Sequence, residues 1–265
     1  MKNKKILITV LSAILTGLSQ HSYSIGFLAW FSLIPFLFVL SKLNSFKDAF
    51  KFSFIWGFIY HLLTIYWLAQ NIGTIPIIAL FSMLLTVFYL SFNTVLIVFI
   101  WYYLKKYYKK YNLLLIPIIW VSIEYVKSYG LLAFPWISLA NSQLAYLYPI
   151  QIAEFTGIYG VSFWIVCLNT IIYSLLINQS IKKVYLLLVT FLFPWFFGYI
   201  LYNNLDEYKL DDLNIVLIQP NIKLSDSRDY SKGNELLNKL IDKTKSAIDN
   251  NTDLVIWPEA ALPFH

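Results

Sequence analysis

The sequence predicts an α-helical membrane domain with several crossings, followed by the start of a soluble α/β domain. Of the 265 residues, 59% are hydrophobic and only 13% are charged, whereas about 25% of a typical soluble domain is charged. The charged residues are also clustered, so that residues 6–41 and 52–104 contain no Asp, Glu, Lys or Arg. Such a composition requires lipid as the solvent for most of the chain.

The membrane domain is expected to comprise residues 1–205 and about seven helices. A bilayer core of about 30 Å is crossed by about 20 apolar helical residues, so each of the two longest uncharged runs can hold two crossings. Polar residues, Gly and Pro divide the apolar sequence further. The expected helices are 6–20, 25–40, 52–68, 77–104, 111–126, 158–180 and 184–202.

Lysines alternate between the connections of these helices. One set of connections contains Lys127 alone among positive residues. Because positive residues stay on the cytoplasmic side, we expect a cytoplasmic N-terminus and a periplasmic segment after residue 205. Short basic clusters between apolar runs also argue against a nucleic-acid partner. The other set contains Lys2, Lys4, Lys5, Lys42, Lys47, Lys51, Lys105, Lys106, Lys109, Lys110, Lys182 and Lys183.

Residues 213–265 have the pattern of soluble α/β structure. Strands are expected at 214–218 and 254–257, with an amphipathic helix at 231–248 between them. This order favours a parallel strand pair with a crossover helix, and reactive groups gather beyond the carboxyl ends of such strands. Gln219-Pro220-Asn221 and Pro258-Glu259 occupy those two positions.

Glu259 is the candidate catalytic residue. It directly follows an apolar strand and lies between Pro258 and Pro263. A carboxylate that is partly shielded in such a segment can act as a general base toward a nucleophile. An acidic residue after a strand can also simply face solvent, and for an isolated glutamate that interpretation is the better one.

Longer motifs resemble the bacterial apolipoprotein N-acyltransferases, whose catalytic domain belongs to the nitrilase superfamily. The most specific string is VIWPEAALP at 255–263, preceded by IVLIQPNI at 215–222. The membrane part adds FIWGF at 54–58 with YWL at 66–68, WVSIE at 120–124 with Lys127, and FPW at 134–136 with Gln143.

The resemblance implies an α-β-β-α sandwich in the periplasm with a Glu-Lys-Cys triad, and Glu259 falls on the position of the glutamate. In that family the cysteine attacks an acyl ester of a membrane phospholipid, and the lysine stabilises the oxyanion. The α-amino group of a diacylglyceryl-cysteine apolipoprotein then accepts the acyl chain. No metal or soluble cofactor is implied, and the expected location is the bacterial cytoplasmic (inner) membrane.

The sequence departs from the family because the expected Lys and Cys lie downstream of Glu259 and the chain ends at His265. Cys167 lies in an apolar run, where a thiol packs as a small hydrophobe, and is no substitute. The main expectation is therefore an acyltransferase represented by its membrane domain and the start of its catalytic domain. The alternatives are a truncated, inactive remnant or one half of a split acyltransferase, and less favourably a transporter.

Phe134, Pro135, Trp136 and Glu154 are candidate substrate-binding residues. They fall in the segment 127–157, which is expected to lie on the outer side and contains little charge. The aromatic residues could guide an acyl chain, or they could belong to a structural re-entrant segment. Glu154 could contact the lipoprotein or be an ordinary loop carboxylate. At the start of this segment, Glu124 and Lys127 are spaced for a local ion pair on one helix. Their match to a glutamate and a basic residue of the family also permits a role in shaping the active-site mouth, which is the less favoured interpretation.

Overall fold

The computed structural model describes residues 2–21, 25–109, 112–204, 213–222, 230–259 and 261. The chain divides into two compact units, Met1–Leu205 and Asp206–His265. They are called the membrane unit and the second unit, and each is described by itself.

The membrane unit is a polytopic helical bundle. Four helical stretches are long and apolar enough to cross a membrane, namely Phe46–Gln70, Pro76–Leu104, Pro149–Ile177 and Ile181–Asn203. Two others, Gly26–Ser41 and Leu115–Val126, are apolar but shorter, so seven crossings remain a prediction. The α-helices are α1 (Lys2–Leu18), α2 (Ile34–Ser41), α3 (Phe46–Ile65), α4 (Pro76–Leu104), α5 (Leu115–Val126), α6 (Ala153–Ile177) and α7 (Ile181–Asn203).

Short 3-10 helices mark where the chain leaves regular α-helix. One of them, η2 (Tyr66–Gln70), extends α3 at its carboxyl end. Another, η1 (Gly26–Trp30), precedes α2, while η3 (Leu139–Gln143) and η4 (Pro149–Ile152) precede α6. The helix expected over 25–40 is thus interrupted between Trp30 and Ile34.

Local capping explains why α3 begins at Phe46 rather than at residue 52. The side chain of Ser45 accepts a hydrogen bond from the backbone N–H of Asp48 at 3.1 Å. Ser45 is therefore the N-cap, and the Asp48 carboxylate lies in the first turn, where the helix dipole favours negative charge. These polar residues start the helix before its apolar run begins.

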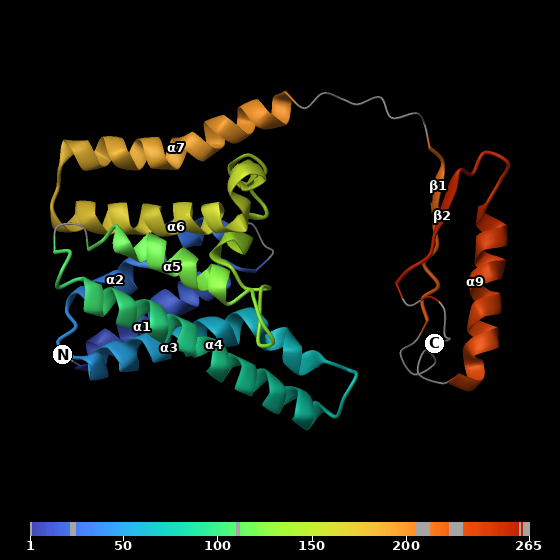
Figure 1. Ribbon diagram of the computed structural model, residues 1–265, viewed down its shortest axis with the longest axis horizontal. Helices are drawn as coiled ribbons and strands as arrows, with labels where there is room; N and C mark the ends of the chain where they lie inside the picture. Colours follow the sequence, from blue (N-terminus) through green and yellow to red (C-terminus); the bar gives the residue numbers. More distant parts are fainter. Residues whose placement is uncertain are drawn as a thin grey trace. The chain divides into compact units, whose positions relative to one another are not determined.

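The helices alternate in direction, so the connections fall at two ends of the bundle. The N-terminus and the connections α2–α3, α4–α5 and α6–α7 lie at the left end in Figure 1. The connections α3–α4 and α5–α6 lie at the opposite end. We call the first the lysine end, because its connections and the adjoining helix ends contain Lys42, Lys47, Lys105, Lys106, Lys109, Lys182 and Lys183.

Buried polar side chains form hydrogen bonds with backbone groups at the junction between η1 and α2. The Asn169 Oδ1 atom of α6 accepts from the Leu33 N–H at 2.9 Å, and its Nδ2 atom donates to the Ala29 carbonyl at 2.7 Å. The Ser12 hydroxyl of α1 donates to the Ser32 carbonyl at 2.6 Å. Non-helical backbone is tolerated at membrane depth only with such partners.

Aromatic packing and one close helix contact stabilise the centre. Trp56 of α3 is fully buried, stacks on Phe36 at 5.3 Å between ring centroids, and meets the edge of Trp120 at 5.6 Å. Gly57 faces α4 so closely that an added Cβ would lie 2.8 Å from the Thr94 hydroxyl oxygen. Small residues commonly permit such helix approaches in membranes.

The second unit contains the predicted parallel strand pair with its crossover helix. Strands β1 (Ile215–Leu217) and β2 (Leu254–Ile256) pair in parallel, with Val216 opposite Val255. Helix α9 (Gly233–Ala247) joins them and buries Leu236 and Leu240. Both strands are shorter than predicted. The full α-β-β-α sandwich remains a prediction.

The pairing by Asn169 predicts a stability difference between two asparagines of the bundle. We expect Asn169→Leu to lower the free energy of unfolding by about 1–3 kcal/mol, because it leaves buried backbone groups unpaired. Asn93→Leu is the matched control, since the Asn93 side-chain nitrogen is buried without a hydrogen-bond partner among the described residues. Thermal unfolding in one detergent measures both, and equal losses would contradict the assignment.

Candidate functional site

The carboxyl ends of β1 and β2 meet at one edge of the two-stranded sheet. Leu217 pairs with Ile256, and the Ile218 N–H donates to the Ile256 carbonyl at 3.0 Å. The segments that follow, Gln219–Asn221 and Pro258–Glu259, therefore leave the sheet side by side. The sequence predicted this juxtaposition, and the strand register produces it.

The backbone before Glu259 is attached to the crossover helix. The Trp257 indole N–H donates to the Thr244 hydroxyl of α9 at 2.9 Å. Beyond it, the Ala261 N–H donates to the Pro258 carbonyl at 3.2 Å, which closes a turn around Glu259. The strand, the indole hydrogen bond and the turn together fix the backbone position of Glu259.

The Glu259 side chain itself is exposed, which corrects the expectation that it is partly shielded. Among the described residues, none forms a hydrogen bond or ion pair with its carboxylate. The physical reason is that the described residues of this unit form a two-stranded sheet with one long helix, and these elements place no second layer over the edge. Pro263, which was expected to help enclose the glutamate, lies outside the described residues.

The turn after β1 has an unusual backbone conformation at Asn221. Its φ angle is +50°, in the left-handed region that Asn adopts more readily than most residues. The Gln219 side-chain nitrogen donates to the Asn221 Oδ1 atom at 3.4 Å. Two neutral amide side chains thus lie at the edge of the sheet from which Glu259 also emerges.

Cys167 belongs to the membrane unit. It lies half-buried within α6, one of the four candidate membrane spans. Among the described residues, no group of three or more His, Cys, Asp or Glu side chains could hold a metal ion.

A second group of candidates lies in the membrane unit, at the end opposite the lysine end. Trp136 is 63% exposed, and its ring centroid lies 5.3 Å from that of Phe134 and 5.8 Å from that of Trp67. Trp136 and Trp67 line a pocket of about 330 Å³ together with Gln20, Tyr66 and other residues. Pro135 is exposed between the two aromatic residues.

This pocket was not predicted as such. Trp67 belongs to the YWL string near a predicted helix end, and nothing in the local sequence pattern indicates that it meets Trp136. The structure brings them together because η2 and the segment after α5 lie at the same end of the bundle.

Glu124 fixes the backbone that follows Trp136. It is 5% exposed, and its Oε1 atom accepts from the Trp120 indole N–H and from the Leu139 N–H, both at 3.1 Å. Its Oε2 atom accepts from the Ser138 hydroxyl at 3.1 Å. A carboxylate with three donors is well satisfied inside the bundle.

Lys127 contributes to the same attachment but not through the predicted ion pair. Its ammonium donates to the Ile137 carbonyl. Burial lowers the pKa of Lys127, and the charge of Glu124 partly offsets this. No ion pair within 4.0 Å joins these two described side chains, because each is engaged by the backbone of residues 137–139. That prediction was wrong, and the pair instead positions the segment that contains Trp136.

Glu154 is exposed in the first turn of α6. A carboxylate there interacts favourably with the helix dipole. Glu154 is not among the residues that line the pocket of Trp67 and Trp136.

Comparison with known proteins gives a consistent match. The family model for the apolipoprotein N-acyltransferase N-terminal domain matches residues 12–171. A protein named apolipoprotein N-acyltransferase from Chlorobaculum tepidum is 28% identical over 277 residues, which cover 99% of this chain and 50% of the relative. Its namesake from Geobacter metallireducens is 30% identical over 276 residues, which cover 98% and 51%. The chain thus spans about half the length of these curated relatives.

Proposed function

Because the chain belongs to the apolipoprotein N-acyltransferase family, we propose that it forms the membrane domain and first catalytic segment of a lipoprotein acyltransferase. The proposed reaction moves an acyl chain from a membrane phospholipid to the N-terminal diacylglyceryl-cysteine of an apolipoprotein. The observation that supports this most is the family match across residues 12–171. The Trp-Pro-Glu segment at the carboxyl edge of a parallel strand pair adds to it.

Glu259 is the general base in this proposal. It accepts the proton of a cysteine thiol, whose sulfur attacks the ester carbonyl so that the C–S bond forms and the C–O bond breaks. Lysophospholipid leaves with a proton. In the second half, Glu259 accepts a proton from the apolipoprotein α-amine as the C–N bond forms and the C–S bond of the thioester breaks, and the cysteine sulfur takes up that proton so that the thiol is restored. The chemistry uses neither a metal nor a soluble cofactor.

The cysteine and the oxyanion-stabilising lysine of the triad are assigned to the portion of the enzyme that this chain does not span. An α-β-β-α sandwich completed by that portion would also provide the layer that shields Glu259. The exposure of the carboxylate in the second unit is compatible with this role, because a base must be reachable by its reaction partner.

We expect Glu259→Gln to reduce acyl transfer by about 10²- to 10⁴-fold, because an amide cannot accept the proton. The measurement is formation of an acyl thioester from labelled phospholipid by the protein that contains this chain. Glu235→Gln is the matched control, since Glu235 is also exposed in the second unit, on α9. Unchanged transfer in Glu259→Gln would remove the glutamate from the mechanism, and no transfer by the unaltered protein would favour an inactive remnant.

Trp136, with Phe134 and Pro135, is proposed to contact the acyl donor. The support is an exposed aromatic pair, Trp67 and Trp136, on a pocket at one end of a membrane bundle. Aromatic side chains of this kind lie at the headgroup level of bilayers. Glu154 is proposed as a contact for the lipoprotein, because it is an exposed charge at the same end.

Replacing Trp136 by Ala should raise the KM for phospholipid several-fold while changing kcat little, because the substitution removes ground-state binding. Tyr129→Ala serves for comparison, since Tyr129 is exposed on the same segment but does not line the pocket. Steady-state kinetics in mixed micelles measure KM and kcat for both variants. Equal KM values for both variants would count against a role of Trp136 in donor binding.

We also propose seven crossings of the bacterial inner membrane, with the lysine end in the cytoplasm. The support is the concentration of lysines in the connections at one end of the bundle. This orientation places the end with Trp136 on the periplasmic side, where the lipoprotein acceptor is found.

The orientation predicts opposite labelling of two introduced cysteines in a Cys167→Ala background. Thr74→Cys, in the α3–α4 connection, should react with an impermeant thiol reagent in cells with a permeabilised outer membrane. Asn44→Cys, in the α2–α3 connection, should react only after lysis. Both positions are exposed, so a reversed pattern would overturn the orientation.

A further inference from the structure

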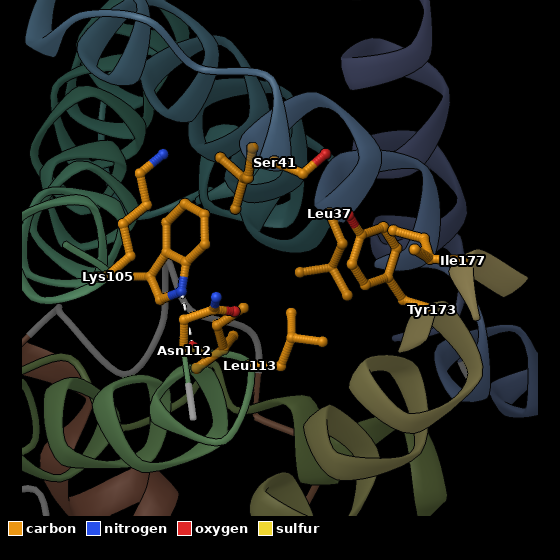
Figure 2. Close-up of a pocket in the computed structure, with 10 residues that line it drawn as sticks. Leu37, Ser41, Lys105, Asn112, Leu113, Tyr173 and Ile177 are labelled. Atoms are coloured by element: carbon orange, nitrogen blue, oxygen red, sulfur yellow. Dashed lines mark hydrogen bonds between the residues drawn. The ribbon is translucent and has the colours of Figure 1, made fainter. Parts of the chain in front are cut away.

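A pocket of about 260 Å³ opens among the helix ends at the lysine end of the membrane unit. It is lined by the ends of α2, α4, α5 and α6 and by the connection between α4 and α5. Lys105 and Asn112 lie on one side of it, and Leu37, Tyr173 and Ile177 on the other (Figure 2). None of the ten residues that line it is acidic.

Lys105 supplies a positive charge whose ammonium donates no hydrogen bond to any residue in the described part of the chain. Its Nζ atom lies 4.9 Å from the ring centroid of Trp101 and 4.3 Å from that of Tyr102. These rings attract the cation but accept no conventional hydrogen bond from it. Within the described part of the chain, Lys105 has no carboxylate within ion-pair distance. Its half-buried position lowers its pKa through desolvation.

Tyr173 supplies a second unused donor from the opposite wall. The residue is 3% exposed, and its ring packs against Phe38 at 4.9 Å. Its hydroxyl forms no hydrogen bond with any described residue and is not one of the fully buried unpaired polar atoms, so the oxygen is accessible. A hydroxyl without a protein partner on a residue that lines the pocket can donate to a polar occupant.

The rest of the wall is apolar. Half of the ten lining residues are aliphatic, namely Leu37, Leu40, Leu113, Ile116 and Ile177, and Trp101 adds an aromatic ring. The volume is slightly below the lower limit of about 300 Å³ for sites that enclose a small molecule. An occupant can therefore place a compact polar group and the beginning of an apolar chain here, while the rest of it remains in the bilayer.

We propose that this pocket binds an anionic glycerophospholipid, with one phosphate oxygen accepting from Lys105, another from Tyr173, and the start of an acyl chain against Leu37 and Ile116. Charge complementarity selects the anionic headgroup, because the lining contains a cation and no acid. The membrane bundle selects a lipid over a soluble anion, because an apolar wall gives free phosphate nothing to bury. Basic pockets between membrane helices bind anionic headgroups elsewhere in this way.

A neighbouring pocket of about 370 Å³ extends the positive character of the same surface. It shares Asn112 and Leu113 with the first and is also lined by Lys109 and Lys183. The Lys183 ammonium donates to the carbonyls of Ser174 and Asn178 at 2.9 Å. Lys183 therefore adds charge nearby but has fewer free donors than Lys105.

The test is lipid binding by the whole purified protein in detergent, followed by native mass spectrometry. The probes are phosphatidylglycerol and phosphatidylcholine with identical acyl chains. We expect preferential binding of phosphatidylglycerol, and a loss of about fivefold to tenfold in its affinity for Lys105→Gln. Tyr173→Phe should weaken binding by a smaller factor, because it removes one hydroxyl. Lys105→Arg should retain the preference.

Lys106→Gln is the matched control. Lys106 is the adjacent lysine, and its Nζ atom also lies over aromatic rings, Tyr103 at 5.2 Å and Tyr107 at 5.5 Å, but it does not line the pocket. Equal losses in Lys105→Gln and Lys106→Gln would overturn the site in favour of diffuse surface charge. Equal binding of both lipids, or full displacement by millimolar inorganic phosphate, would also overturn it. If Lys105→Gln does not fold, phosphatidylglycerol binding by Tyr173→Phe is compared with that by Lys106→Gln. Weaker binding by Tyr173→Phe alone supports the site, and equal binding by the two variants overturns it.

Discussion

Backbone polar groups inside a bilayer need partners within the protein, and this constraint governs the membrane unit. Regular helix satisfies it automatically. Where the chain departs from helix, buried side chains form hydrogen bonds with the backbone groups that have no helical partner. Asn169 does so at the break before α2, and Glu124 does so in the segment after Trp136. Gln143 does the same through the Gly26 carbonyl and the Trp30 indole. The irregular segments, including the one that forms the aromatic pocket, depend on these few polar residues.

The sequence was informative wherever local chemistry decides structure. Uncharged runs predicted the long helices, and the soluble α/β pattern of residues 213–265 predicted a second unit with a parallel strand pair. It could not reveal the break within 25–40, because the partner of the Leu33 N–H is a side chain 136 residues later. Capping by Ser45 was readable in principle, yet an apolar-run criterion overlooks a polar first turn.

The candidate site shows the same division between local and distant information. Strand, proline and glutamate follow one another in the chain, so the position of Glu259 at the sheet edge could be predicted. Its exposure depends on whether a further layer covers that edge, which no local pattern encodes. The spacing of Glu124 and Lys127 suggested an ion pair, but unpaired backbone groups at 137–139 were the stronger competitors for both side chains. In the protein interior, leaving a backbone polar group unpaired costs more free energy than a buried ion pair contributes after its desolvation.

The sequence separation of these polar contacts also has a consequence during synthesis. Chains grow at about 5–20 residues per second. Glu124 and Leu139 are 15 residues apart, so Leu139 is synthesised about one to three seconds after the carboxylate that pairs with its N–H. Leu33, at the break before α2, lies 136 residues before Asn169, so its partner is synthesised about 7 to 27 seconds later. During that interval the Leu33 N–H and the Ala29 carbonyl lack the side chain that pairs them in the folded protein, so water or another polar group has to take its place.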